Sequence, residues 1–458
     1  MAMQVTLVEG GNLWTDATSL RLDSNSAGIS ILDWVPKVGN DGDAYVDEVL
    51  TLLIAGSSHD DLASKVQALD NMIRLAECAR HHPHQKGIYL RCQLTNESGA
   101  RQALVLAARR ENGTALYGPP VSPGNIVEAY KLVVRRMPWW EHPTGAHQDS
   151  ATISSCLGGT FAMTGVTGDV PARLLALQMS GHAGGGGPLY EFWAGFRTSR
   201  YGTIANFVPV WELEAGTNGT DASDAAEATA SGGNHVVVSF ATATMAVRST
   251  ITAVQAAGAN NEHQRGRFLV LLRAKVGAST SARVRLSSGM SGASLWNTQK
   301  RVVVSSTDWL LYPMGEVVLP PSAFNDFEGT TIAMDSAALR LEAERASGGN
   351  SLYLDCMILI PVDEGFAHFS GLDVQTDLSY GGFISQEADG RLLSYSLSNG
   401  AVNGIPDTSG THPGSFYAPV GASSLIVAGQ RSASSVLADH CDLYVGYVPR
   451  WAMLRGAE

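Results

Sequence analysis

The sequence has few charged residues and no blocks of like charge. Only 16% of its 458 residues are charged, and the net charge at pH 7 is −12. Proteins that bind nucleic acid neutralise phosphates with clustered Lys and Arg, so we expect no nucleic-acid partner. No apolar run approaches the roughly 20 residues that a membrane-spanning helix needs. We therefore expect no membrane insertion.

Cysteine is scarce, and its spacing excludes two common uses. The five cysteines are odd in number, lie far apart and form no Cys-x-x-Cys pair. This pattern excludes a disulfide framework and a zinc-ribbon site. The first residues, Met1-Ala-Met-Gln-Val-Thr, lack the positive and apolar segments of a secretory signal. We expect the chain to be made in a reducing cytoplasm.

Catalytic motifs are also missing. Gly289-Met-Ser-Gly-Ala lacks the last glycine of a serine-hydrolase turn. The glycine run at 184–187 lacks the Gly-Lys-Ser/Thr ending of a phosphate loop. Acidic residues are scattered, and no pair has the frame of a glycosidase. We therefore expect that the protein is not an enzyme.

One stretch predicts a long helix, over residues 59–80. Ser58 is suited to the N-cap, and Asp60 and Asp61 would oppose the positive end of the helix dipole. Apolar residues then recur at one-face helical spacing, and they are Leu62, Val66, Leu69 and Ile73. Pro83 ends the pattern.

The remainder predicts a mainly β protein. Between 211 and 361, runs of four to eight β-branched and apolar residues alternate with Gly, Ser, Asn and Pro, which is typical of a β-sandwich. The flanking regions are also rich in short strands. The predicted parts are an N-terminal β-sandwich or barrel with one helix (1–141), a Gly/Ser/Thr-rich linker (142–168), a C-terminal β-sandwich (169–208 plus 364–458) and an inserted β jelly roll (209–363).

Two candidate binding sites fall within the inserted region. Glu212 and Glu214 alternate, so on one strand both side chains would point the same way. With Asp355 they would offer three hard oxygen ligands to a calcium ion; the alternative is an exposed strand face. Trp296 stands alone among polar residues and could stack on a sugar ring, whereas Trp309 lies in an apolar run that favours a core position.

The inserted region resembles a carbohydrate-binding jelly roll of the CBM6/CBM35-like kind. The matching pieces begin at Glu212 (Glu-Leu-Glu-Ala), Ala230 (Ala-Ser-Gly-Gly-Asn-His-Val-Val), Phe268 (Phe-Leu-Val-Leu-Leu-Arg-Ala), Gly315 (Gly-Glu-Val-Val-Leu-Pro) and Leu352 (Leu-Tyr-Leu-Asp-Cys-Met-Ile-Leu-Ile-Pro). The resemblance implies a structural calcium held by a strand acidic pair and a late aspartate, which correspond to Glu212, Glu214 and Asp355.

The flanking regions resemble a distal tail, or baseplate-type, protein of a tailed bacteriophage. The matching pieces are the inserted helix, Arg135-Arg-Met-Pro-Trp-Trp-Glu, Gly168-Asp-Val-Pro-Ala-Arg-Leu and the final strands that lead to Pro449-Arg-Trp. The resemblance implies a virion protein of the tail tip, assembled in the host cytoplasm. It would form a ring, most often a homohexamer, and contact tube, tape-measure or hub proteins.

The two resemblances together predict a ring component that presents a jelly roll for adhesion to host cell-surface polysaccharide. Two other functions remain open. One is a tail fibre or other adhesin, which would form a trimer. The other is a non-catalytic accessory module of a secreted carbohydrate-active enzyme, which would carry an export signal.

Overall fold

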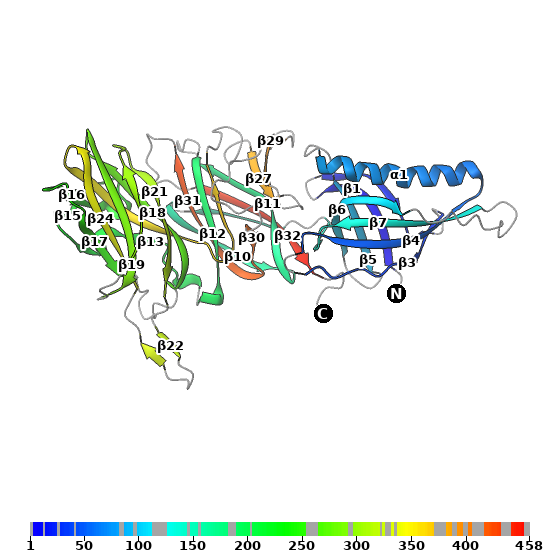
Figure 1. Cartoon of the computed structure of the whole chain (residues 1–458), viewed down its shortest axis with the longest axis horizontal. Helices are drawn as coiled ribbons and strands as arrows, with labels where there is room; N and C mark the ends of the chain where they lie inside the picture. The colour runs from blue at the N-terminus through cyan, green and yellow to red at the C-terminus, as the bar shows by residue number, and fades with distance from the viewer. Residues whose placement is uncertain are drawn as a thin grey trace.

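The protein is mainly β with one long helix, as predicted, and a computed structural model shows its parts arranged end to end (Figure 1). The structure describes residues 3–11, 14–24, 28–40, 43–81, 87–94, 99–111, 126–143, 147–153, 157–181, 189–201, 204–252, 264–291, 296–320, 323–325, 331–333, 337–370, 382–386, 392–396, 402–404, 416–431 and 441–452.

The N-terminal body is built from strands that wrap around an apolar core next to the helix. Its elements are β1 (Met3–Gly11), β2 (Trp14–Arg21), β3 (Ile29–Asp33), β4 (Val46–Gly56), α1 (His59–His81), β5 (Gly87–Leu94), β6 (Ala100–Glu111), β7 (Ile126–Arg136) and β8 (Trp140–Glu141). Neighbours pair in the order β2-β1-β5-β6 and in the order β3-β4-β7-β6, so β6 belongs to both runs and closes the body.

Helix α1 begins as the sequence predicts. Ser58 Oγ accepts a hydrogen bond from the Asp61 backbone N–H at 3.1 Å, which is an N-cap contact. The Asp61 carboxylate in turn accepts the backbone N–H of Ser57 at 2.8 Å. Leu62 and Leu69 pack into the core of the body, so the predicted stripe is the buried face of the helix.

The C-terminal β-sandwich consists of two facing sheets. Its elements are β9 (His147–Ile153), β10 (Leu157–Val166), β11 (Val170–Gly181), β12 (Leu189–Thr198), the 3-10 turns η2 (Ser199–Tyr201) and η3 (Ile204–Asn206), β26 (Phe366–Phe369), β27 (Gly382–Gln386), β28 (Leu392–Ser396), β29 (Val402–Gly404), β30 (Tyr417–Ala418), β31 (Gly421–Arg431) and β32 (Cys441–Trp451). One sheet has the order β10-β31-β12-β26, and β9, β11 and β27 belong to the other, around β32.

The prediction that 142–168 is a linker was wrong. Within that range, β9 pairs with β32 and β10 pairs with β31, so both are strands of the sandwich. In β10 the apolar residues Leu157, Phe161 and Met163 are buried, and small or polar residues stand between them. The high Gly, Ser and Thr content concealed this alternation, which is the signal of a half-buried strand.

The jelly roll is inserted between β12 and β26. Its elements are β13 (Val210–Glu212), η4 (Leu213–Ala215), β14 (Thr217–Asn218), β15 (Ala222–Ala226), η5 (Ser231–Gly233), β16 (Asn234–Ser239), β17 (Ala246–Thr252), β18 (Gly266–Val276), β19 (Thr280–Met290), β20 (Asn297–Val304), β21 (Leu310–Leu319), β22 (Ala323–Asn325), β23 (Thr331–Ala333), β24 (Ala337–Gly348) and β25 (Ser351–Pro361). Its two main sheets have the orders β15-β16-β25-β18-β21 and β14-β17-β24-β19-β20.

The jelly roll and the C-terminal sandwich share one apolar core. A single cluster of buried side chains runs through both parts. At the junction the rings of Phe207 and Phe268 stack with centroids 5.6 Å apart. The backbones also approach closely there, since a Cβ on Gly195 would lie 2.0 Å from the Pro361 carbonyl oxygen. The inserted domain is therefore packed onto its host and is not joined to it by a loose tether.

Among the residues that the structure describes, no helix is long and apolar enough to cross a membrane.

Candidate functional site

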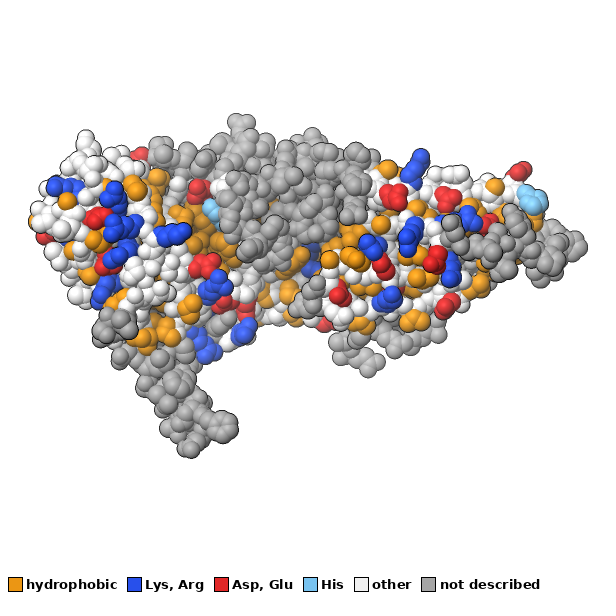
Figure 2. All heavy atoms as spheres, in the orientation of Figure 1, with side chains coloured by type: hydrophobic (Ala, Val, Ile, Leu, Met, Phe, Trp, Pro, Cys, Tyr) orange, Lys and Arg blue, Asp and Glu red, His pale blue; other side chains and the backbone are white. Residues whose placement is uncertain are grey.

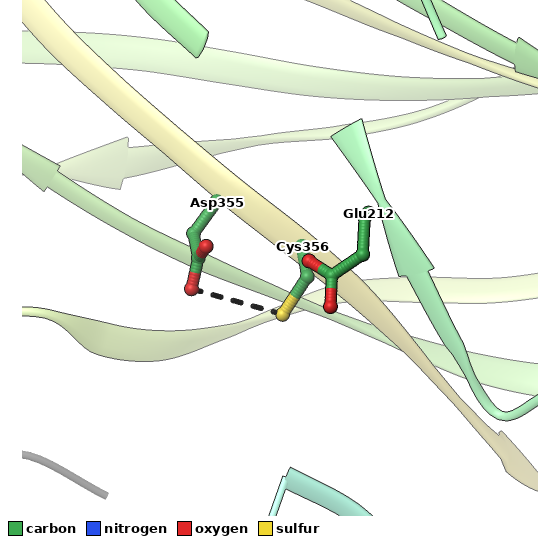
Figure 3. Close-up of side chains that lie close together, drawn as sticks. All are labelled: Glu212, Asp355 and Cys356. Atoms are coloured by element: carbon green, nitrogen blue, oxygen red, sulfur yellow. Dashed lines mark hydrogen bonds between the residues drawn. The ribbon is translucent and has the colours of Figure 1, made fainter. Parts of the chain in front are cut away.

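The predicted acidic residues meet at one end of the jelly roll. Glu212 ends β13, which pairs with β25 so that Glu212 stands opposite Cys356. Asp355 precedes Cys356 on β25, and ligand atoms of these three side chains all lie within 4.8 Å of one another. Figure 3 shows the three side chains converging from the two strands. The sequence thus predicted correctly that Glu212 and Asp355 come together.

Asp355 already has a cationic partner. Arg273, on the neighbouring strand β18, donates from Nη1 to Asp355 Oδ2 at 2.5 Å, and both side chains are buried. The backbone N–H of Ser231 donates to both carboxylate oxygens, at 2.9 and 3.1 Å. Arg273 therefore supplies the positive charge that a buried carboxylate requires.

Glu212 and Glu214 lack such a partner. Ser231 Oγ donates to Glu212 Oε1 at 2.6 Å. The other oxygens, Glu212 Oε2 and Glu214 Oε2, are buried and have no hydrogen-bond partner among the described residues. Buried carboxylate oxygens are costly unless a donor or a cation satisfies them.

The expected strand alternation of Glu212 and Glu214 was wrong, although the two carboxyl groups still approach one another. Strand β13 ends at Glu212, and Glu214 lies in the 3-10 turn η4. Gly232, at φ +64°, faces both: a Cβ there would lie 3.3 Å from Glu214 Oε1 and 3.8 Å from Glu212 Oε1. The glycine turn therefore leaves space beside the two carboxyl groups that a side chain would fill.

The electrostatics of the cluster favour protonation in the absence of a cation. The pKa of Glu214 is raised to about 7, chiefly by burial and also by the negative charges of Glu212 and Asp355. Burial also raises the pKa of Asp355 to about 6, against the lowering effect of Arg273. The pKa of Glu212 is raised as well, again chiefly by burial. Three acidic groups share one guanidinium, so two negative charges have no counterion.

This donor set fits a calcium ion. Calcium takes carboxylate and carbonyl oxygens, and the two unpaired carboxylates would together balance its double charge. Glu212 from β13 and Glu214 from η4 would hold the ion, with Asp355 beside them. The Cys356 thiol is a poor candidate, because burial raises its pKa and calcium prefers oxygen to sulfur.

The sequence interpretation missed Arg273 and Ser231. Arg273 could have been found, because a lone arginine inside the apolar run of β18 needs a buried acidic partner. Ser231 could not, because its contacts to Asp355 and Glu212 depend on a turn that no local pattern links to either residue.

The two tryptophans considered for sugar stacking differ in their surroundings. Trp296 is half-buried, and the guanidinium of Arg340 lies 3.8 Å from the centroid of its ring. One face of this ring is therefore covered by a cation, and stacking on a sugar would use the other face. Trp309 is 8% exposed, and its Nε1 donates to Thr229 Oγ1 at 3.1 Å. The core interpretation of Trp309 is thus confirmed.

Comparison with known proteins finds only distant likenesses. No protein-family model matches the sequence, and no curated protein matches it either. One similar solved structure is the phage P2 baseplate in its activated conformation with Ca, at 8% identity and TM-score 0.28, covering 97% of this chain and 98% of that chain. Another is TmCBM61 in complex with β-1,4-galactotriose, at 9% identity and TM-score 0.20, covering 34% of this chain and 90% of that chain.

A third similar structure is an exo-β-1,3-galactanase from Phanerochaete chrysosporium with galactose. It is 11% identical, with TM-score 0.22, and the match covers 70% of this chain and 84% of that chain. At TM-scores this low, none of the three structures establishes a function for this chain, which has to be argued from its own residues.

Proposed function

We propose that this protein is a structural component of a tailed-phage tail tip, similar to distal tail proteins. In this proposal the N-terminal body forms a ring with other copies of itself, and the family resemblance implies six copies. The jelly roll adheres to glycans of the host surface. The chain would act in the virion tail and contact tube, tape-measure or hub proteins.

The observation that carries this proposal is the position of the insertion. The helix-bearing body lies at one end of the molecule and the jelly roll at the other, with the sandwich between them (Figure 1). The jelly roll leaves and re-enters the sandwich through β12 and β26, which pair side by side. A ring of N-terminal bodies would therefore carry its jelly rolls at the far end of each subunit, where a surface ligand could reach them.

The N-terminal body also exposes apolar side chains that suit assembly. Val35, Val38 and Tyr45 lie between β3 and β4 and are 78%, 49% and 45% exposed, and Leu32 on β3 is 57% exposed. Strand β3 pairs with β4 along one edge, and on its other edge Ile29 forms a single bridge with Ser24, so β3 lies at the border of its sheet among the described residues. Open edges and contiguous apolar patches are typical of surfaces that bind another chain.

The test of the ring is the solution mass of the full chain, measured by light scattering at several concentrations. A species near six times 48.4 kDa supports the proposal. A trimer would replace it with a tail fibre or other adhesin. A monomer at every concentration, with no ring seen by electron microscopy of the virion, would favour the accessory-module alternative.

We further propose that the chain is non-catalytic, and that calcium at Glu212, Glu214 and Asp355 stabilises the jelly roll. Release of reducing sugar from host cell-wall polysaccharide by the purified chain would contradict the first statement. The second would be contradicted by a melting temperature that does not respond to calcium or to a chelator.

For Trp296, the substitution Trp296→Ala should weaken binding to host cell-wall material; unchanged binding would remove this residue from the adhesion site.

A further inference from the structure

Arginine and glutamate side chains alternate over the outer face of one jelly-roll sheet. Arg285 on β19 stands opposite Arg301 on β20 and, across its other edge, opposite Glu342 on β24. Arg283 stands opposite Glu344 in the next row. The residues between them point into the core and are buried, namely Val284, Leu286, Leu341 and Ala343. Figure 2 shows blue side chains with red ones between them on the part of the jelly roll drawn at the left.

On this face the carboxylates lie closer to the sheet and the guanidiniums lie closer to solvent. Arg283 and Arg301 each donate from Nη1 to the same oxygen, Glu344 Oε1, at 3.4 and 3.0 Å. Arg285 donates from Nε to Glu342 Oε2 at 2.9 Å. The side chains of Arg283 and Arg301 are 50% exposed, whereas that of Glu344 is only 14% exposed. The hydrogen bonds to the glutamates therefore orient the guanidiniums towards solvent.

The positive charges on this face exceed the negative ones. Two carboxylates serve three guanidiniums, and Arg340, which alternates with Glu342 on β24, adds a fourth above Trp296. Arg285 and Arg301 form a directly opposed like-charge pair, which destabilises a sheet. Glu342 and Glu344 offset this repulsion only in part, because Glu344 also pairs with Arg283. The net charge of the whole chain does not cancel this local excess, because exposed charges are screened beyond about 8–10 Å.

A guanidinium is well suited to bind a phosphate or a carboxylate group. It has five N–H donors in a planar fork that matches these anions. The contacts to Glu344 use one nitrogen each of Arg283 and Arg301. Further donors on each guanidinium are thus directed towards solvent or a ligand.

We propose that this arginine face, formed by Arg283, Arg285, Arg301 and Arg340, binds an anionic polysaccharide of the host surface. The inference rests on the adhesion role proposed above and names its ligand class. Phosphate or carboxylate groups of the polymer contact the guanidiniums. Glu342 and Glu344, whose side chains are 17% and 14% exposed, lie between them, where they accept hydrogen bonds from sugar hydroxyls.

The spacing of charge favours a glycan over a nucleic acid. A nucleic acid presents a phosphate at every nucleotide, and the proteins that bind it neutralise many of them with clustered cations. Here the two glutamates would repel such a dense row of phosphates. A sugar polymer with sparser charges places neutral, hydroxylated stretches over the glutamates instead.

The test measures binding of the full-length protein to four immobilised probes: poly(glycerol phosphate) teichoic acid, polygalacturonate, neutral dextran and single-stranded DNA. We expect binding to the phosphate or the uronate polymer, and the stronger of the two identifies the source of the anion. Binding should weaken as salt rises. Dextran and DNA should bind less than either anionic polysaccharide.

The double variant Arg285→Gln/Arg301→Gln should lose affinity by on the order of tenfold per guanidinium, which is the effect of removing a charge-assisted hydrogen bond. Arg285→Lys/Arg301→Lys keeps the charge but not the fork, and should fall between the double Gln variant and the wild type. The matched control is Arg267→Gln, because Arg267 is 55% exposed, close to the 50% of Arg301, and is paired with Glu316 on the other sheet. Its affinity should be unchanged.

Melting temperatures separate a binding defect from a folding defect. Each variant should have the same melting temperature as the wild-type protein. Equal binding by the double variant and the wild type would overturn the inference, as would tighter binding of DNA than of both polysaccharides. The solution mass separates this inference from the ring. A hexamer that does not bind polyanions would contradict only the proposal for the arginine face. A monomer whose polyanion binding depends on the arginines would contradict only the proposal of a ring.

Discussion

Glu48 in the N-terminal body and Glu212 in the jelly roll both withdraw carboxylate oxygens from water, but with different partners. Glu48 accepts hydrogen bonds from Arg136 Nε at 2.7 Å, from the backbone N–H of Lys37 at 3.2 Å and from Trp34 Nε1. Glu212 has Ser231 Oγ on one oxygen and no partner among the described residues on the other.

The difference separates a buried carboxylate whose charge the chain balances from buried carboxylates whose charge it does not balance. We call Glu48 with Arg136 the finished pair, and Glu212 with Glu214 the unfinished cluster. Around Glu48 the chain supplies every donor and the opposing charge, so the cluster is a structural element complete in itself. Around Glu212 and Glu214 the chain supplies acceptors and leaves two charges unbalanced. Burial of unpaired charge is expensive, so the second cluster requires something that the chain does not contain, either protons or a cation.

The largest expected effect comes from breaking the finished pair. Arg136→Met should destabilise the N-terminal body by roughly 3–5 kcal/mol, because it leaves Glu48 buried without a counter-charge. Urea unfolding followed by tryptophan fluorescence measures this loss. The double variant Arg136→Met/Glu48→Leu is the control and should recover most of the stability, since replacing both partners with apolar residues removes the stranded charge. A loss no larger in the single variant than in the double would show that the pair is not what stabilises the body.

The next effect comes from completing the unfinished cluster. Calcium at about one hundred times its Kd should stabilise the protein by about 2.7 kcal/mol, because it binds only the folded state. Scanning calorimetry of the full chain, with calcium and with a chelator, gives the shift in melting temperature. Glu212→Gln/Glu214→Gln should abolish the shift, and Glu316→Gln, which changes an exposed glutamate on β21, should keep it. The same melting temperature with calcium and with chelator would rule out the site.

A smaller effect is expected from removing one donor of the finished pair. Trp34→Phe deletes the indole N–H that donates to Glu48 Oε2 but leaves Arg136 and Lys37 in place. We expect the free energy of unfolding to fall by about 1–2 kcal/mol, which is at the low end of the range for a hydrogen bond to a charged group. Urea unfolding of Trp34→Phe beside Arg136→Met ranks the two; a larger loss for Trp34→Phe would mean that packing of the indole, and not the ion pair, dominates.

The smallest effect is a pH dependence confined to the unfinished cluster, since Glu214 is only partly buried. Its pKa is raised from 4.5 to about 7 in the folded state, so the folded state binds its proton more tightly than the unfolded state does. Stability without calcium should therefore fall as pH rises from about 4.5 to about 7. Glu214→Gln should flatten this slope, and calcium should oppose it. A calcium-free stability that rises across this window in proportion to Glu214 ionisation would contradict the assignment.

The sequence predicted those features that depend on local pattern. Helix α1 follows from the N-cap at Ser58 and the apolar stripe from Leu62 to Ile73. The meeting of Glu212 with Asp355 followed from the jelly-roll resemblance and was correct. The helix is visible because capping and periodicity act between neighbours in the chain, whereas the meeting of the two acidic residues, which lie far apart in the chain, depended on the resemblance.

Features that depend on contacts across the fold were missed. The pairing of Arg273 with Asp355 joins residues 82 positions apart, and no local pattern connects them. The range that contains β9 and β10 predicted a linker, because the small residues of β10 hide its alternation until β31 is placed beside it. Strand β9 is identified by its pairing with β32. The outward arginine face also depends on register, since Arg285 and Arg301 become neighbours only when β19 and β20 pair.

The attachment of the jelly roll has a mechanical consequence. The two ends of the insertion leave from β12 and β26, whose ladder holds four residue pairs, from Phe192–Phe369 to Gly195–Phe366. Tension on a bound jelly roll would load this ladder at one end, so its hydrogen bonds would open in sequence and not together. What resists the pull is the side-chain contact beside it, where Phe207 stacks on Phe268 and the Leu311 backbone N–H donates to Gln430 of β31 at 2.7 Å. The shared core therefore makes the joint stiff in bending, and it sets the force at which the two parts would separate.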